Sequence, residues 1–130
     1  MPNLTALMTL LAVLLYAYMG IRVSQSRAAT GIKAPATTGN ADFERVFRVQ
    51  MNTLEWMPIV LPAMWLTAYY FGDKFAAAGG AVWIIGRILY MQGYSAAANK
   101  RGTGFVVQGI AALVMWGAAL VGVIMALMRA

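Results

Sequence analysis

The sequence predicts an all-α integral membrane protein formed by a single four-helix domain, and three observations support this prediction. Of the 130 residues, 62% are apolar and only 11% are charged, whereas a soluble domain is normally about 25% charged. The mean hydropathy is +0.69. The apolar residues fall into runs of roughly 20 or more, the length that a helix needs to cross the hydrocarbon core of a bilayer. A chain of this length has room for one domain, so residues 1–130 are expected to form one bundle.

The first transmembrane span is expected over residues 4–23. The start of the chain, Met1-Pro2-Asn3, has no basic segment, and no small-residue cleavage site follows the apolar run. We therefore expect a retained span rather than a signal peptide. Residues 24–40 are rich in Ser, Thr, Arg, Gly and Pro, and this composition predicts a polar loop.

The second span is expected over residues 42–71, although only its second half is apolar. A short Gly-Asp-Lys connection follows it, so the second and third spans should be antiparallel neighbours. The third span is expected over residues 75–94, with its helix continuing to about Lys100. The fourth is expected over residues 105–128, after a turn at residues 102–104.

The distribution of Lys and Arg predicts the orientation of these spans, because cytoplasmic loops carry an excess of both. The loops after the first and third spans should face the cytoplasm, with both termini outside. Short loops and an Ala-rich composition favour a bacterial inner membrane over the endoplasmic reticulum. The cations on the cytoplasmic side are Arg22, Arg27, Lys33, Lys100 and Arg101, against Lys74 and Arg129 on the other.

The composition also excludes several kinds of chemistry. The chain has no Cys and no His, so it lacks a disulfide framework, a thiol nucleophile of its own and the usual ligands of a metal site. The formal net charge is +6. Because the basic residues are scattered among apolar segments, we do not expect a nucleic-acid partner.

Polar side chains form a stripe on the second predicted helix. At 100° per residue, Glu44, Arg45, Arg48, Asn52 and Glu55 share an arc of about 100°. A charged residue at the centre of a membrane helix costs roughly 2.5–3.5 kcal/mol. This stripe must therefore face protein, water or a polar ligand.

A second stripe lies on the third predicted helix, where Arg87, Tyr90 and Tyr94 share one face. Arg101 joins this face if the helix continues that far. Both stripes lie at the cytoplasmic ends of their spans, and they could face a common cleft.

Two interpretations of the stripes remain open. In a purely structural network, Glu55 pairs with Arg48 or Arg87, and Glu44 pairs with Arg48. The four Arg of the stripes, however, outnumber the two Glu by two. This surplus favours a small anionic ligand with carboxylates, because the planar guanidinium group binds a carboxylate through two hydrogen bonds.

Two sequence motifs resemble those of the MAPEG family, the membrane-associated proteins in eicosanoid and glutathione metabolism. The first is FERVFRVQMNTLEWMP at residues 43–58, and the second is GRILYMQGY at residues 86–94, followed by Arg101. The resemblance extends over essentially the whole chain, including the spacing of the two motifs.

The resemblance implies a homotrimer with glutathione, the cosubstrate, held between adjacent subunits near the cytoplasmic face. It implies that Arg101 stabilises the glutathione thiolate. Arg27 or Ser26 would reach the ligand's carboxylate from the end of the first span, and Trp56 stands where a Tyr is common. The implied glutathione-binding residues are Arg27, Arg48, Gln50, Asn52, Glu55, Trp56, Arg87, Tyr90 and Tyr94.

The resemblance therefore implies a glutathione transferase that conjugates the thiolate to lipophilic electrophiles, with glutathione-dependent reduction of lipid hydroperoxides as a related activity. A protein without Cys can do sulfur chemistry when the thiol arrives with the substrate, and a nearby guanidinium group favours the thiolate. The alternative within the same fold is a non-catalytic, lipid-binding scaffold protein. A small transporter is a third hypothesis, and the chain lacks the internal repeat typical of that class.

Overall fold

The computed structural model describes all 130 residues and contains four long α-helices and no strands. The helices are α1 (Asn3–Thr30), α2 (Ala41–Phe71), α3 (Asp73–Ala96) and α4 (Gly102–Arg129), with a 3₁₀ turn, η1 (Ala98–Lys100), before α4. This confirms the predicted all-α, four-helix class. By length and composition, α1, α3 and the helical segment containing α4 can cross a membrane, whereas α2 is long enough but highly charged in its first half.

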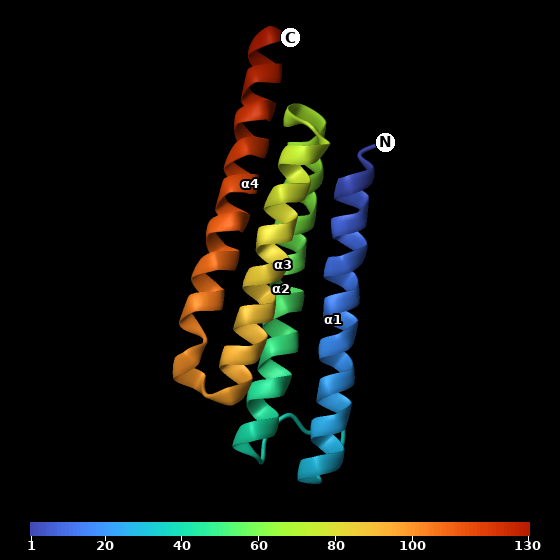
Figure 1. The fold of residues 1–130 in the computed structure, drawn as a ribbon, viewed down its shortest axis with the longest axis vertical. Helices are drawn as coiled ribbons and strands as arrows, with labels where there is room; N and C mark the ends of the chain where they lie inside the picture. The colour runs from blue at the N-terminus through green and yellow to red at the C-terminus, as the bar shows by residue number, and fades with distance from the viewer.

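The four helices form an elongated bundle (Figure 1). Helices α2 and α3 form its centre, and α1 and α4 pack on opposite sides of this pair. Both termini lie toward the end that contains the α2–α3 turn, while the other two connections lie at the opposite end. We call the half of the bundle near those two connections the basic half. It holds eight of the ten cations, namely Arg22, Arg27, Lys33, Arg45, Arg48, Arg87, Lys100 and Arg101.

The first helix is longer than the sequence predicts, so the expected loop over residues 24–40 shrinks to residues 31–40. No Gly or Pro interrupts the chain between Val23 and Thr30, and the helix simply continues through this polar segment. It ends at Gly31, which has φ +74° and donates its backbone N–H to the carbonyl of Arg27. A left-handed glycine is a common helix terminator because it carries no Cβ.

The prediction that the third helix continues to about Lys100 is wrong. Helix α3 ends at Ala96, where the next residue, Ala97, has extended backbone, and η1 then leads into α4. The expected turn at residues 102–104 is also wrong, because these residues form the first turn of α4. Arg101 therefore immediately precedes α4 and does not extend the face of α3.

Glycine sets the distance between α3 and α4 in the basic half. A Cβ placed on Gly104 would lie 2.5 Å from the Cα of Tyr90 and closer still to its amide nitrogen, and a Cβ on Gly86 would lie 2.5 Å from the backbone nitrogen of Gln108. The two backbones therefore touch at these positions, as small residues allow in membrane helices. This contact fixes the start of α4 against the middle of α3.

We predict that Gly104→Ala lowers the free energy of unfolding by about 1–3 kcal/mol, because the added methyl group must push two backbones apart. The matched control is Gly109→Ala in the same helix, where a Cβ meets nothing within 4 Å; it should be neutral or stabilising by up to about 1 kcal/mol. Denaturation with sodium dodecyl sulfate in mixed micelles measures both. Equal stability of the two variants would contradict the close α3–α4 contact.

Candidate functional site

Arg48 and Glu55 on α2 form an ion pair through two parallel hydrogen bonds. Arg48 Nη1 donates to Glu55 Oε1 at 2.8 Å, and Nη2 donates to Oε2 at 3.0 Å. The two residues lie seven apart, two turns of helix, so both side chains project from the same face. About half of each side chain remains accessible, which leaves the pair able to exchange partners with a bound ligand.

Arg87 on α3 lies behind this pair and is completely buried. Its Nη2 donates to Asn52 Oδ1 at 3.0 Å and to Thr53 Oγ1 at 2.7 Å, and its Nε donates to Thr53 Oγ1 at 3.2 Å. Its guanidinium carbon lies 4.3 Å from the ring centroid of Tyr90, and its Nη1 has no hydrogen-bond partner. Arg87 does not pair with Glu55, so this part of the structural-network interpretation is wrong.

Arg87 determines how Asn52 presents its amide. Because the amide oxygen accepts from Arg87, the Asn52 NH₂ group points the other way, toward Glu55 Oε2 at 3.5 Å. The same guanidinium group supports the ring of Tyr90 from behind through a cation–π contact. The buried cation thereby holds two side chains that line one cleft.

A cleft of about 340 Å³ opens in front of these groups, between α2, α3 and the start of α4. The rings of Tyr90 and Tyr94 lie 5.4 Å apart, and the Arg101 guanidinium carbon lies 5.6 Å from the Tyr94 ring centroid. The break between α3 and α4 returns Arg101 to the tyrosines although it is not on their helix. The lining residues are Arg48, Asn52, Tyr90, Tyr94, Arg101 and Phe105.

The structure brings together most of the predicted binding residues and separates three of them. Glu55 adjoins the cleft through its pair with Arg48, and Trp56 meets Phe105 edge-on at 5.8 Å. Arg87 lies behind the cleft rather than in it. Sequence reasoning missed Phe105 and Thr53, the latter because its hydroxyl group faces the buried Arg87 from outside the polar stripe of α2.

Arg27 and Gln50 lie outside the cleft. Arg27 donates to the carbonyl of Ala36 at 2.8 Å and covers the ring of Phe43 at 4.7 Å, so it organises the α1–α2 loop. Gln50 packs against α1, where its Nε2 lies 2.9 Å from the position of a Cβ on Gly20. Neither residue lines the cleft within this one chain.

One of the two cations that line the cleft has no ion-pair partner. Arg101 is exposed and forms no ion pair, since the two ion pairs of the chain are Arg45–Asp42 and Arg48–Glu55. The cleft therefore offers a free guanidinium group, a second one that can exchange its partner, an outward amide and two phenol groups. This set suits a small anion that carries several polar groups.

Comparison with known proteins identifies the family of the chain. The MAPEG family model matches residues 5–121, nearly the whole chain. The chain belongs to the MAPEG family. The family match covers both polar motifs and all the residues that line the cleft.

Individual relatives in the family share about two fifths to one half of their aligned residues with this chain. An uncharacterized protein of Synechocystis sp. is 48% identical over 92% of this chain and 87% of its own length. Human microsomal glutathione S-transferase 2 is 42% identical over 78% of this chain and 69% of its own length. Bovine leukotriene C4 synthase is 40% identical over 75% of this chain and 65% of its own length. This MAPEG chain is thus similar to members named for glutathione transfer and for leukotriene synthesis.

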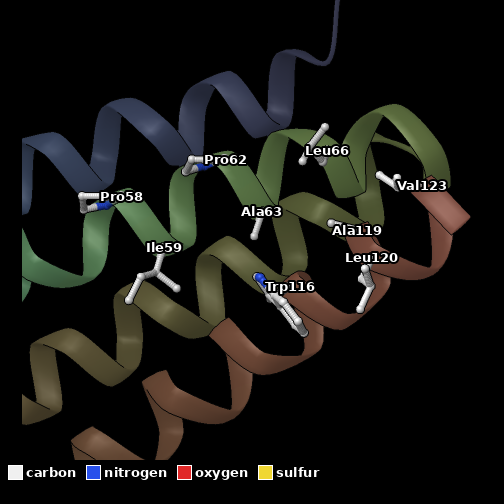
Figure 2. Close-up of a pocket in the computed structure, with 9 residues that line it drawn as sticks. All are labelled: Pro58, Ile59, Pro62, Ala63, Leu66, Trp116, Ala119, Leu120 and Val123. Atoms are coloured by element: carbon white, nitrogen blue, oxygen red, sulfur yellow. The ribbon is translucent and has the colours of Figure 1, made fainter.

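An apolar groove of about 450 Å³ lies between α2 and α4 of this MAPEG protein, farther from the basic half than the polar cleft. Figure 2 shows Ile59 and Pro62 of α2 on one side and Trp116 of α4 on the other. Ile59 lies seven residues after Asn52, so both residues share one face of α2. The polar cleft and the apolar groove therefore follow one another along one surface.

We predict that Thr53→Val lowers the free energy of unfolding by about 1.5–3 kcal/mol, because the buried guanidinium group of Arg87 loses its hydroxyl acceptor. Thr67→Val is the matched control. Thr67 is equally buried, but its hydroxyl only donates to the carbonyl of Met115, so its loss should cost about 0.5–1.5 kcal/mol. Detergent denaturation compares the two variants, and a smaller loss at Thr53 than at Thr67 would contradict the role assigned to Thr53.

Proposed function

We propose that the protein is a membrane-bound glutathione transferase that joins the glutathione thiolate to lipophilic electrophiles. The observation that carries the proposal is the polar cleft at the α2–α4 seam, with Arg101 unpaired at its rim and Arg48 in an exchangeable pair. The names of the relatives support glutathione chemistry. The adjoining apolar groove supports a second substrate that is lipid-soluble.

The groups of the cleft complement those of glutathione. The tripeptide carries two carboxylates and one amine, and the Arg48–Glu55 pair offers one cation and one carboxylate. When glutathione binds, one of its carboxylates pairs with Arg48 in place of Glu55, and its amine pairs with Glu55 in place of Arg48. Asn52, held by Arg87, supplies a fixed amide donor, and the phenol groups of Tyr90 and Tyr94 supply two more hydrogen-bonding groups.

We assign to Arg101 the role of stabilising the sulfur as an anion. A thiol with a pKa near 8.5 is only a few per cent ionised at neutral pH, and a guanidinium group close to it favours the thiolate. The thiol proton leaves to water. The thiolate then forms a carbon–sulfur bond with the electrophile, whose leaving group departs with the bonding electrons, or whose ring opens when the substrate is an epoxide.

The assembly that we propose is a homotrimer in a bacterial inner membrane, with the basic half at the cytoplasmic side and four membrane-crossing helices. Arg27 and Gln50 lie away from the cleft of their own chain. In a trimer that binds glutathione between subunits, these two residues are available to the cleft of a neighbour. Crosslinking in mild detergent should give trimers, and a clean monomer that still binds glutathione would contradict this assembly.

We predict that Arg101→Ala lowers kcat with 1-chloro-2,4-dinitrobenzene by about tenfold or more, the equivalent of about 1.4 kcal/mol in the transition state. Its effect on glutathione affinity should be much smaller, because Arg101 acts on the sulfur. Stopped-flow absorbance near 240 nm, which follows thiolate formation, and calorimetric titration separate the two effects.

The control for Arg101→Ala is Lys100→Ala, which removes an adjacent exposed cation that does not line the cleft. Lys100→Ala should change neither kcat nor the affinity for glutathione. Equal losses of turnover and affinity in Arg101→Ala would make Arg101 a binding contact and not a thiolate-stabilising group. Absence of both glutathione binding and turnover in the unmodified protein would instead favour the lipid-binding scaffold.

We predict that Glu55→Gln and Arg48→Ala each weaken glutathione binding by about tenfold to a hundredfold, since each removes a charge-assisted contact worth about 1.5–3 kcal/mol. The turnover rate at saturating glutathione should change little. Glu44→Gln is the control, because Glu44 lies at the start of α2 and accepts only from the backbone of Gly39. Unchanged affinity in either test variant would remove that residue from the site.

A further inference from the structure

A second polar cleft lies on a different face of the basic half, between α1 and α3. Its volume is about 490 Å³, and none of its lining residues lines the first polar cleft, which lies between α2, α3 and the start of α4. Helix α1 contributes Tyr18 and Arg22, which lie one turn apart. Helix α3 contributes Gln92 and Ser95, which also lie one turn apart, together with Met91 and Ala96.

Arg22 has no carboxylate available to it anywhere in the chain. Asp42 pairs with Arg45 and Glu55 pairs with Arg48. Glu44 accepts from the backbone of Gly39, and Asp73, at the far end of the bundle, accepts from the first turn of α1. All four side-chain carboxylates of the protein thus contact other groups, and the guanidinium group of Arg22 is free to bind an anion from outside the chain.

The neighbours of Arg22 also lack partners. The hydroxyl oxygen of Ser95 is buried and forms no hydrogen bond. Gln92 forms no side-chain hydrogen bond although it lines the same cleft. A cation, an amide group and a hydroxyl group that line one cleft without partners are suited to the oxygens of a phosphate group.

The surroundings of the cleft are apolar and exposed. On α1, Leu11 is 39% and Tyr18 48% exposed on the face that leads away from Arg22. On α3, Ile85 is 54% and Leu89 40% exposed on the side that leads away from Gln92. Exposed apolar tracks on two adjacent helices that begin at one polar cleft match the shape of a lipid, which has one polar head and two chains.

We propose that this α1–α3 cleft binds the phosphate headgroup of an anionic phospholipid, with its acyl chains lying along α1 and α3. Arg22 pairs with the phosphate, and Gln92 and Ser95 donate hydrogen bonds to its oxygens. The lipid fits the cleft better than a soluble phosphate because the apolar tracks continue directly from the polar residues. The site is separate from the proposed glutathione cleft and does not depend on it.

The test uses delipidated full-length protein in neutral detergent, with bound lipid counted by native mass spectrometry. Phosphatidylglycerol and phosphatidylcholine with identical acyl chains are compared. One basic residue near a membrane surface is worth about 1 kcal/mol toward an anionic lipid, which is about fivefold. We therefore expect phosphatidylglycerol to bind about fivefold or more tightly, and Arg22→Gln to abolish this preference.

The matched control is Lys33→Gln, which removes one exposed cation from the α1–α2 loop in the same half. It should keep the preference, and Gln92→Leu, which leaves the net charge unchanged, should weaken it even if Arg22→Gln fails to fold. All three variants should keep the glutathione turnover of the unmodified protein. Equal binding of the two lipids, or equal behaviour of Arg22→Gln and Lys33→Gln, would overturn the proposal. Displacement of phosphatidylglycerol by soluble glycerol 3-phosphate would show that a free phosphate is the ligand instead.

Discussion

The burial of Arg87 is the constraint on which the polar half of this bundle depends. A fully buried guanidinium group must be surrounded by acceptors or by aromatic rings, because removing it from water is otherwise prohibitive. Thr53 and Asn52 of α2 supply the acceptors, and Tyr90 supplies the ring. The hydrogen bonds of this one cation tie α2 to α3 and fix the outward side of Asn52. The contacts that the buried Arg87 makes with Asn52, Thr53 and Tyr90 thus shape the cleft in front of it.

The close approach of α3 and α4 completes the same site. Gly104 lets the α4 backbone rest on Tyr90, and the preceding residues turn sharply enough to bring Arg101 to the ring of Tyr94. A continuous helix from α3 would carry Arg101 about 10 Å beyond Tyr94, at 1.5 Å per residue. The break after Ala96 is therefore what places the free cation at the rim of the cleft.

Much of the architecture follows from the sequence, and the remainder depends on tertiary contacts. Apolar runs and helical periodicity predict four helices and the stripe that contains Arg48, Asn52 and Glu55. Periodicity gives the face of a residue but not the element that it meets, so it could not show that Gln50 packs on α1 or that Arg87 lies behind the cleft. The end of α3 was missed because no Gly or Pro marks it in the sequence, and the backbone simply turns extended at Ala97.

The polar cleft and the apolar groove lie one after the other along α2 and α4, and this arrangement suits the proposed reaction in a membrane. The polar cleft lies in the basic half near the helix ends, where a water-soluble tripeptide can enter, and the apolar groove beside Ile59 and Trp116 lies deeper along the same helices. A lipid-soluble electrophile partitions into the bilayer, so its concentration beside the groove exceeds its concentration in water. In the proposed reaction, a site that spans both environments brings together two reactants that no single solvent dissolves well, and this proximity lowers the entropic part of the barrier to their reaction.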